Sequence, residues 1–89
     1  MSDEKRLERL RFRSWHRGTR EMDLLLGSFA DAYLASFSSE QLDMYEAMLN
    51  ENDPDLYNWI IGKDRLPTEL QNSVMQKLCG HHYVGKKEN

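Results

Sequence analysis

The amino-acid sequence predicts an all-α protein, a compact single domain of about five short helices. Hydrophobic residues recur with the 3.6-residue period of helices, whereas no stretch alternates as a half-buried strand does. Glycines and helix-capping residues separate the periodic stretches by short connections. With 89 residues and 39% hydrophobic content, the chain has room for one core. We therefore expect one domain over residues 1–89, ordered from about 5 to 80, with a flexible tail at 83–89.

The first helix is expected at residues 4–17. Leu7, Leu10 and Ser14 form a sparse stripe among many charged residues, and this stripe has helical spacing. Gly18 follows and can take the left-handed conformation in which helices commonly end. We therefore expect a turn directly after residue 17.

The second helix carries the clearest pattern. Its apolar residues fall at i, i+3, i+4, i+7 and i+11, and they are Met22, Leu25, Leu26, Phe29 and Tyr33. Gly27 lies inside this helix, where glycine costs about 1 kcal/mol relative to alanine. Gly27 marks either a close contact with another helix or a tolerated flaw.

A capping box predicts the start of the third helix. Ser38 is followed three residues later by Gln41, so each side chain can bond the other residue's backbone N–H group. The inward face would consist of Leu42, Tyr45 and Leu49, with Met44 and Met48 beside it.

The two remaining helices are short. The fourth is expected to begin with Asp53 as N-cap, followed by proline at the first helical position, and to end at Gly62. The fifth is expected to begin near Pro67 or Thr68 and to end before Gly80. Their apolar residues are Leu56, Trp59 and Ile60, then Leu70, Val74 and Leu78.

Charge is segregated along the chain behind a net charge of −3. Residues 1–21 hold seven basic and four acidic side chains, 22–61 hold eight acidic and no basic ones, and 62–89 hold five basic and three acidic ones. This polarity suits orientation on a partner protein and argues against a DNA-wrapping surface, because phosphate would be repelled by the acidic middle. Solvated faces of no special function remain the alternative.

Several classes of protein are excluded or disfavoured by what the chain contains. The longest apolar runs have three residues, far below the roughly 20 that span a bilayer, so we expect a soluble protein without membrane insertion. The single cysteine, Cys79, favours a reducing compartment. No signal sequence is recognisable, and Asp3, Glu4 and Glu8 are atypical of a presequence. We expect the bacterial cytoplasm rather than the mitochondrial matrix.

Enzymatic and metal-binding functions lack the residues that they need. The only concentration of histidine and cysteine is Cys79, His81 and His82 near the chain end, and its spacing matches no standard zinc site. No glycine-rich loop with a nucleotide-binding pattern is present. We therefore predict no catalytic residue, no metal site and no enzyme.

Nucleic-acid binding is an alternative function that the N-terminal region suggests. Arginines are interleaved there with Phe12 and Trp15, a composition that suits stacking on single strands. These arginines are Arg6, Arg9, Arg11, Arg13, Arg17 and Arg20. The acidic middle of the chain weakens this interpretation, and no stable nucleic-acid complex is expected. A small regulatory protein of antitoxin-like character is a third class that an acidic helical domain leaves open.

The segment Arg17-Gly18-Thr19-Arg20-Glu21 has two interpretations. Local helix physics accounts for it, because Gly18 ends one helix and the Glu21 charge complements the N–H groups of the next. Alternatively, the bend presents Arg17 and Glu21 outward as a charged pair that docks a partner, with Gly18 allowing close backbone approach.

This segment also carries a resemblance to a known family. Arg17-Gly18-x-x-Glu21, continued by Met22-Asp23 and an apolar helix, resembles the RGxxE signature of the succinate dehydrogenase flavoprotein assembly factors, bacterial SdhE and its mitochondrial relatives. A second block, running from Asp53 to Ile60, resembles the family's Asp-Pro-Asp-Leu-aromatic-x-Trp segment. The similarity covers residues 5–78. His16 departs from the pattern, since many members carry arginine there.

The resemblance implies a small helical protein that binds the flavoprotein subunit of succinate dehydrogenase, or of the related fumarate reductase. Such a protein promotes covalent attachment of FAD to a histidine of that subunit, and we expect it to be a monomer without tightly bound FAD. The RGxxE region is implied as the contact. The expected partner-binding residues are Arg17, Gly18, Glu21, His16, Arg20, Asp23, Asp55 and Tyr57.

Overall fold

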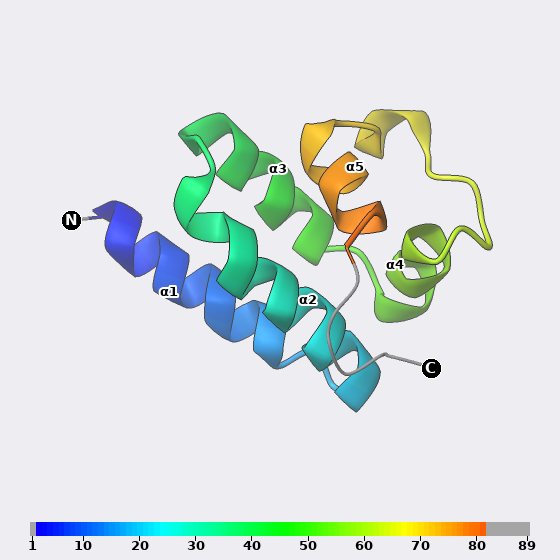
Figure 1. Ribbon diagram of the computed structural model, residues 1–89, viewed down its shortest axis with the longest axis horizontal. Coiled ribbons are helices and arrows are strands. Elements are labelled where there is room, and N and C mark those ends of the chain that lie inside the picture. The colour runs from blue at the N-terminus through cyan, green and yellow to red at the C-terminus, as the bar shows by residue number, and fades with distance from the viewer. Residues whose placement is uncertain (1, 82–89) are drawn as a thin grey trace. The chain divides into compact units, whose positions relative to one another are not determined.

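The computed structural model describes residues 2–81, and its regular structure there is helical throughout (Figure 1). Five α-helices and two short 3₁₀ helices, but no strand, occur within these residues, so the prediction of an all-α fold with five helices is confirmed. The elements are α1 (Ser2–Trp15), α2 (Arg20–Tyr33), η1 (Leu34–Ser36), α3 (Ser39–Leu49), α4 (Asp53–Ile60), η2 (Thr68–Leu70) and α5 (Ser73–Cys79). The expected flexible tail, 83–89, lies outside the described residues.

The helices form two compact units, one over residues 2–37 and the other over Ser38–His81. In the first unit α1 lies alongside α2, and η1 contacts both of them (Figure 1). In the second unit α5 contacts both α3 and α4. The expectation of a single domain over residues 1–89 stays a prediction.

Close contact between α1 and α2 explains the glycine inside α2. A Cβ atom on Gly27 would overlap the indole ring of Trp15, so only a hydrogen at this position leaves room for that ring. On α1, Leu10 and Ser14 are fully buried, and the Ser14 hydroxyl donates a hydrogen bond to the Leu10 carbonyl oxygen at 2.8 Å. Of the two interpretations of Gly27, the structure therefore supports the close contact.

The predicted apolar stripe of α2 forms the buried face of this helix. Met22, Leu25, Leu26 and Phe29 are buried, and Tyr33 is half-buried with its ring centroid 4.8 Å from that of Phe29. Residues three to four apart lie on the same side of a helix, so these apolar side chains form one continuous face. That face is buried because it packs against the core.

The capping box predicted at the start of α3 is present. The backbone N–H of Gln41 donates to Ser38 Oγ at 3.1 Å, and the N–H of Ser38 donates to Gln41 Oε1 at 2.9 Å. The predicted face of α3 is buried, and it consists of Leu42, Tyr45 and Leu49, joined by Met48, whereas Met44 is half-buried.

The start of α4 differs by one residue from the prediction. Asn52, not Asp53, is the N-cap, because its carboxamide oxygen accepts the N–H of Asp55 at 3.0 Å and its backbone is extended. Asp53 is then the first residue of the helix, and its charge lies beside the exposed N–H groups. Gly62, with φ of +84°, follows the last turn in the left-handed region, so the predicted end of this helix is confirmed.

The predicted fifth helix is two elements rather than one. Thr68–Leu70 is a 3₁₀ turn, after which Gln71 is extended and Asn72 caps a new helix, α5. The physical reason is that the Asn72 carboxamide accepts the N–H of Met75 at 2.9 Å, which starts α5 at Ser73. Its end at Cys79, before Gly80, agrees with the prediction.

Candidate functional site

The bend between α1 and α2 is the first part of the candidate site. α1 ends at Trp15, two residues earlier than predicted, so Arg17 and Gly18 both lie in the connection. Gly18 has φ of +118°, a conformation that L-amino acids with a side chain rarely adopt. A Cβ atom at Gly18 would meet nothing within 4 Å, so its requirement for glycine is conformational, and the space around it is open. Residues 16–23, which comprise this connection and the first turn of α2, are called the α1–α2 elbow below.

Thr19 starts α2 as its N-cap, a role that the sequence analysis missed. Its hydroxyl accepts the N–H of Met22 at 3.3 Å, and its backbone is extended. Glu21 lies in the first turn of α2, as predicted, where a negative charge interacts favourably with the exposed N–H groups. A threonine followed by acidic residues in the next turn is the signal that identifies such a cap.

A single carboxylate joins the two sides of the α1–α2 elbow. Asp23 Oδ1 accepts the backbone N–H of Arg17 at 2.6 Å, six residues back along the chain. This short bond to a charged acceptor holds the connection against the first turn of α2, and both residues are half-buried. The structure thus gives Asp23, an expected partner-binding residue, a bond within the elbow itself.

Apart from Met22, which is buried in the face of α2, the rest of the α1–α2 elbow faces outward. His16, Gly18, Thr19, Arg20 and Glu21 are all exposed. Within residues 2–81 the Glu21 carboxylate forms no ion pair and no side-chain hydrogen bond. The structure therefore brings six of the expected site residues together, and they are His16, Arg17, Gly18, Arg20, Glu21 and Asp23.

A cationic and aromatic cavity adjoins the α1–α2 elbow on α1. It has a volume of about 160 Å³ and is lined by Phe12, Arg13, His16 and Arg17. The Phe12 and His16 rings are stacked, with centroids 3.9 Å apart and planes inclined by 23°. His16 Nδ1 lies 2.7 Å from the Phe12 carbonyl oxygen, to which it donates a hydrogen bond because a carbonyl can only accept. Phe12 and Arg13 were not among the site residues expected from the sequence.

The other two expected site residues lie in the second unit. Asp55 is exposed in the first turn of α4, and its carboxylate accepts from the Asn52 side chain at 3.0 Å. Tyr57 and Trp59 are half-buried on the same helix. Trp59, one of the apolar residues predicted on this helix, thus keeps part of its surface exposed.

Trp15 bears on the nucleic-acid alternative. Its ring is half-buried against Gly27, and its Nε1–H donates to Asp31 at 3.4 Å. Arg11 forms an ion pair with the same carboxylate at 3.2 Å. Trp15 and Arg11 thus take part in packing α1 to α2, so Phe12 is the aromatic residue of this region that is open to solvent.

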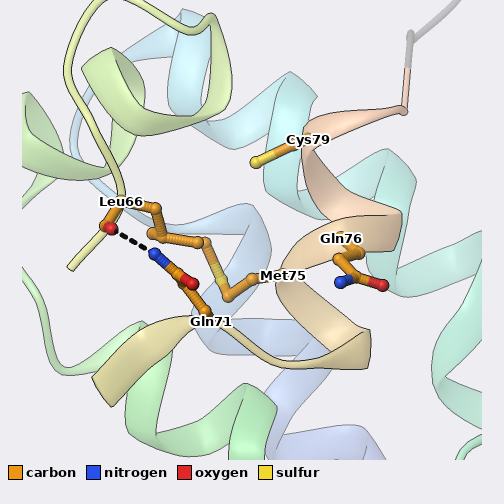
Figure 2. A pocket seen from close by; sticks show the side chains of 5 residues that line it. All are labelled: Leu66, Gln71, Met75, Gln76 and Cys79. Atoms are coloured by element: carbon orange, nitrogen blue, oxygen red, sulfur yellow. Dashed lines mark hydrogen bonds between the residues drawn. The ribbon is translucent and has the colours of Figure 1, made fainter. Parts of the chain in front are cut away.

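The region of Cys79 contains a cavity. The cavity of about 370 Å³ is lined by Leu66, Gln71, Met75, Gln76 and Cys79, and the Gln71 side chain bonds the Leu66 carbonyl oxygen across one end at 2.9 Å (Figure 2). The Cys79 thiol donates to the Trp59 carbonyl oxygen at 3.7 Å, and burial raises the pKa of this thiol. Among residues 2–81 no three metal-ligating side chains come together, and His82 lies outside them.

Neither cavity fits a dinucleotide. The cavity beside the α1–α2 elbow is smaller than the roughly 300–1,000 Å³ of most ligand pockets. The cavity beside Cys79 has no cationic side chain among its lining residues with which to hold a pyrophosphate. Within residues 2–81 no helix is both long and apolar enough to cross a membrane. The described part of the chain presents a charged elbow on a small helical scaffold.

Comparison with known proteins names the family. The chain belongs to the family described as flavinator of succinate dehydrogenase, whose model matches residues 8–82 and therefore includes the α1–α2 elbow and the Asp53–Ile60 segment. The family expected from the RGxxE motif is confirmed.

The relatives come from both eukaryotes and bacteria. The chain is 42% identical over 79 residues to succinate dehydrogenase assembly factor 2, mitochondrial, of Dictyostelium discoideum, covering 89% of this chain and 55% of that protein. It is 44% identical over 83 residues to the protein of that name from Debaryomyces hansenii, with 90% and 58% covered. It is 37% identical over 73 residues to the FAD assembly factor SdhE of Acetobacter pasteurianus, with 82% and 67% covered. The chain spans about half the length of the mitochondrial relatives.

Proposed function

We propose that this chain is an assembly factor that binds the flavoprotein subunit of succinate dehydrogenase and promotes covalent attachment of FAD to that subunit. The observation that carries the proposal is the family match over residues 8–82, which includes the α1–α2 elbow, where Gly18 and Glu21 of the RGxxE motif are exposed and Arg17 is half-buried. The names of the relatives, as assembly factors for succinate dehydrogenase and for FAD, support the same activity.

The α1–α2 elbow is the proposed docking surface. Gly18 supports this role because the space around it is open, so the backbone of another chain can approach closely. Arg17 would supply a forked contact to a carboxylate or carbonyl group of the partner, and Glu21 is an exposed acceptor in the same turn. His16, Arg20 and Asp23 would extend or hold this surface, while Asp55 and Tyr57 would form a second contact in the other unit.

The proposed mechanism is selection of a partner conformation. Attachment of the flavin requires its ring to be aligned with a histidine that belongs to the partner, and the partner's own groups perform the reaction. A protein that binds the aligned conformation more tightly raises its population. For a partner aligned in about 1% of molecules, a binding preference of about 3 kcal/mol brings that fraction near one half. No bond-forming step is then assigned to a side chain of this protein.

We also propose the oligomeric state, the ligands and the location of this protein. The protein acts as a monomer without catalytic residues, does not hold FAD tightly, and forms no stable complex with nucleic acid. The fumarate reductase flavoprotein is a second partner of related structure. The cytoplasm of a bacterium is the proposed location. Two observations on the described residues support the statement about FAD: the cavity beside the α1–α2 elbow is only about 160 Å³, and the cavity beside Cys79 has no cationic lining residue.

Deletion of the gene followed by in-gel flavin fluorescence tests the proposed function. We expect the fluorescent band of the dehydrogenase flavoprotein to be lost and to return when this chain is supplied again. An immunoblot for the flavoprotein controls for loss of the subunit itself. A flavin band of unchanged intensity in the deletion strain would contradict the proposal.

A further inference from the structure

Phe12 is an exposed aromatic residue on a helix that is otherwise rich in charge. Its exposed fraction is 62%, and among the described residues Ile61 in the second unit, at 52%, is the other large hydrophobic residue of comparable exposure. Isolated exposed apolar residues are common on protein surfaces, so exposure by itself does not indicate a binding site. The surroundings of Phe12, however, distinguish it from Ile61.

The first difference is that Phe12 is held in place. Its ring stacks on His16 one turn later, and the bond from His16 Nδ1 to the Phe12 carbonyl oxygen fixes the orientation of the imidazole. Two stacked rings on adjacent turns form an ordered aromatic plate, which loses little side-chain freedom when a partner covers it. The sequence position of His16 also places this plate directly beside the α1–α2 elbow.

The second difference is the charge around the plate. Arg13 and Arg17 line the same cavity as the two rings, and none of the four residues that line it in the described chain is acidic. Guanidinium groups bind carboxylates through paired hydrogen bonds. The cavity of about 160 Å³ has the size for one side chain rather than for a nucleotide.

We propose that the cavity formed by Phe12, Arg13, His16 and Arg17 receives an acidic side chain of the flavoprotein subunit, while an apolar residue beside that acid covers Phe12. This inference rests on the proposed function for the identity of the partner, and it extends the contact from the α1–α2 elbow along the outer face of α1. Charge complementarity determines the choice of occupant, since two cations and no acid line the cavity. A central apolar contact rimmed by charged pairs is the common anatomy of protein interfaces.

A matched pair of truncations tests the apolar contact. Phe12→Ala and Ile61→Ala each remove an exposed hydrophobic side chain from the full 89-residue chain. We expect Phe12→Ala to weaken binding to the purified flavoprotein subunit about tenfold or more, as interface anchors do, and Ile61→Ala to change it less than about twofold. Circular dichroism verifies that both variants keep their helices. Equal affinities for Phe12→Ala and wild type would overturn the inference.

A second pair of variants tests the charge. Arg13 lines the cavity, whereas Arg9 is exposed one turn earlier on the same helix and does not line it. We expect Arg13→Gln to weaken binding at least about threefold more than Arg9→Gln, with a smaller dependence on salt concentration than wild type. Equal effects of the two changes would show that only the net charge of α1 matters and would overturn the assignment of the cavity.

Crosslinking identifies the occupant. A photoreactive phenylalanine analogue at position 12 should crosslink the flavoprotein subunit at a peptide that contains aspartate or glutamate next to an apolar residue. A crosslink to a basic peptide, to nucleic acid or to a second copy of this chain would overturn the inference. The result is separable from the proposed function, because that function is tested by the flavin band of the deletion strain with and without the wild-type chain, whichever residue of the partner contacts Phe12.

Discussion

Two glycines of this protein, one in each unit, end helices in different ways. Gly62 follows α4 with φ of +84°, and backbone bonds complete the turn: Gly62 N–H donates to the Trp59 carbonyl at 3.2 Å and Lys63 N–H to the Asn58 carbonyl at 2.8 Å. Gly18 follows α1 with φ of +118°, but the N–H of the preceding residue, Arg17, bonds the carboxylate of Asp23 at 2.6 Å.

The comparison separates a helix stop from a candidate site. The turn at Gly62 is closed by the main chain alone, so local helix physics explains it completely. The α1–α2 elbow instead depends on side chains from both sides, with Asp23 holding Arg17 and Thr19 capping α2. A turn held by side chains positions them relative to one another, which a surface for partner recognition requires.

Substitution of both glycines gives the largest expected effect. Gly18→Ala and Gly62→Ala each place a side chain at positive φ, and each should lower the free energy of unfolding by about 1–3 kcal/mol. Only Gly18→Ala should reduce flavinylation of the partner, by about tenfold or more, because its Cβ occupies the proposed contact. Urea denaturation and in-gel flavin fluorescence measure the two effects. Similar loss of flavinylation in both variants would remove the distinction between the two turns.

Removal of the Asp23 carboxylate should weaken the α1–α2 elbow itself. Asp23→Ala leaves the half-buried N–H of Arg17 without its acceptor, and we expect a loss of about 1–2 kcal/mol in unfolding free energy. Asp23→Asn keeps an acceptor oxygen and should recover more than half of that loss. Asn72→Ala, which removes the cap of α5 in the second unit, is the control and should leave flavinylation of the partner unchanged. If Asp23→Ala and wild type had the same free energy of unfolding in urea denaturation, the bond would make no contribution to stability.

A change at Arg17 should affect binding more than stability. Arg17→Lys keeps the backbone N–H that bonds Asp23, so the melting temperature should stay within about 2 °C of wild type. The fork of the guanidinium is lost, and we expect flavinylation to fall about three- to tenfold. Glu21→Gln is the companion change at the other charged residue of the motif. Parallel losses of melting temperature and flavinylation would instead support a purely structural role for Arg17.

The smallest expected effect concerns Cys79 in the second unit. Burial raises the pKa of its thiol above the ordinary value, so the folded chain should react with iodoacetamide at pH 8 more slowly than the unfolded chain. The raised pKa stabilises the fold below the ordinary thiol pKa of about 8.5, and this contribution is lost as the pH rises through the folded value. Cys79→Ser should abolish that alkaline dependence, which denaturation at several pH values measures. Rapid alkylation at pH 8 would contradict a structural thiol.

Local sequence patterns were sufficient to predict the existence of the helices. They were not sufficient to predict where α4 and α5 begin, because several residues there can act as N-caps. The capping box of Ser38 and Gln41 and the stripe of α2 involve residues within one or two turns, so propensity and periodicity describe them. At the starts of α4 and α5, by contrast, more than one residue can cap. Asn52 competes with Asp53, and Asn72 competes with Thr68, and the choice depends on which backbone becomes extended.

Most residues of the α1–α2 elbow were predictable from the sequence, but the role of Thr19, the part played by Phe12 and Arg13, and the bonds within the site were not. Gly18 and Glu21 are recognisable because glycine after a helix and acid in a first turn have local causes. The bond from Arg17 to Asp23 and the cavity beside Phe12 could not be predicted from the sequence. Both depend on the direction in which α2 leaves the turn and on side-chain rotamers.

The sequence by itself determined that this protein is helical, where its charged turn lies and which family it belongs to. The tertiary structure alone decided that Gly27 accommodates the ring of Trp15, that Asp23 closes the α1–α2 elbow and that Phe12 stays open beside two arginines. The physical reason is the distance along the chain over which each kind of interaction acts. Helix formation depends on neighbours within a few residues, whereas contacts between helices depend on how their faces pack, which local propensity does not specify.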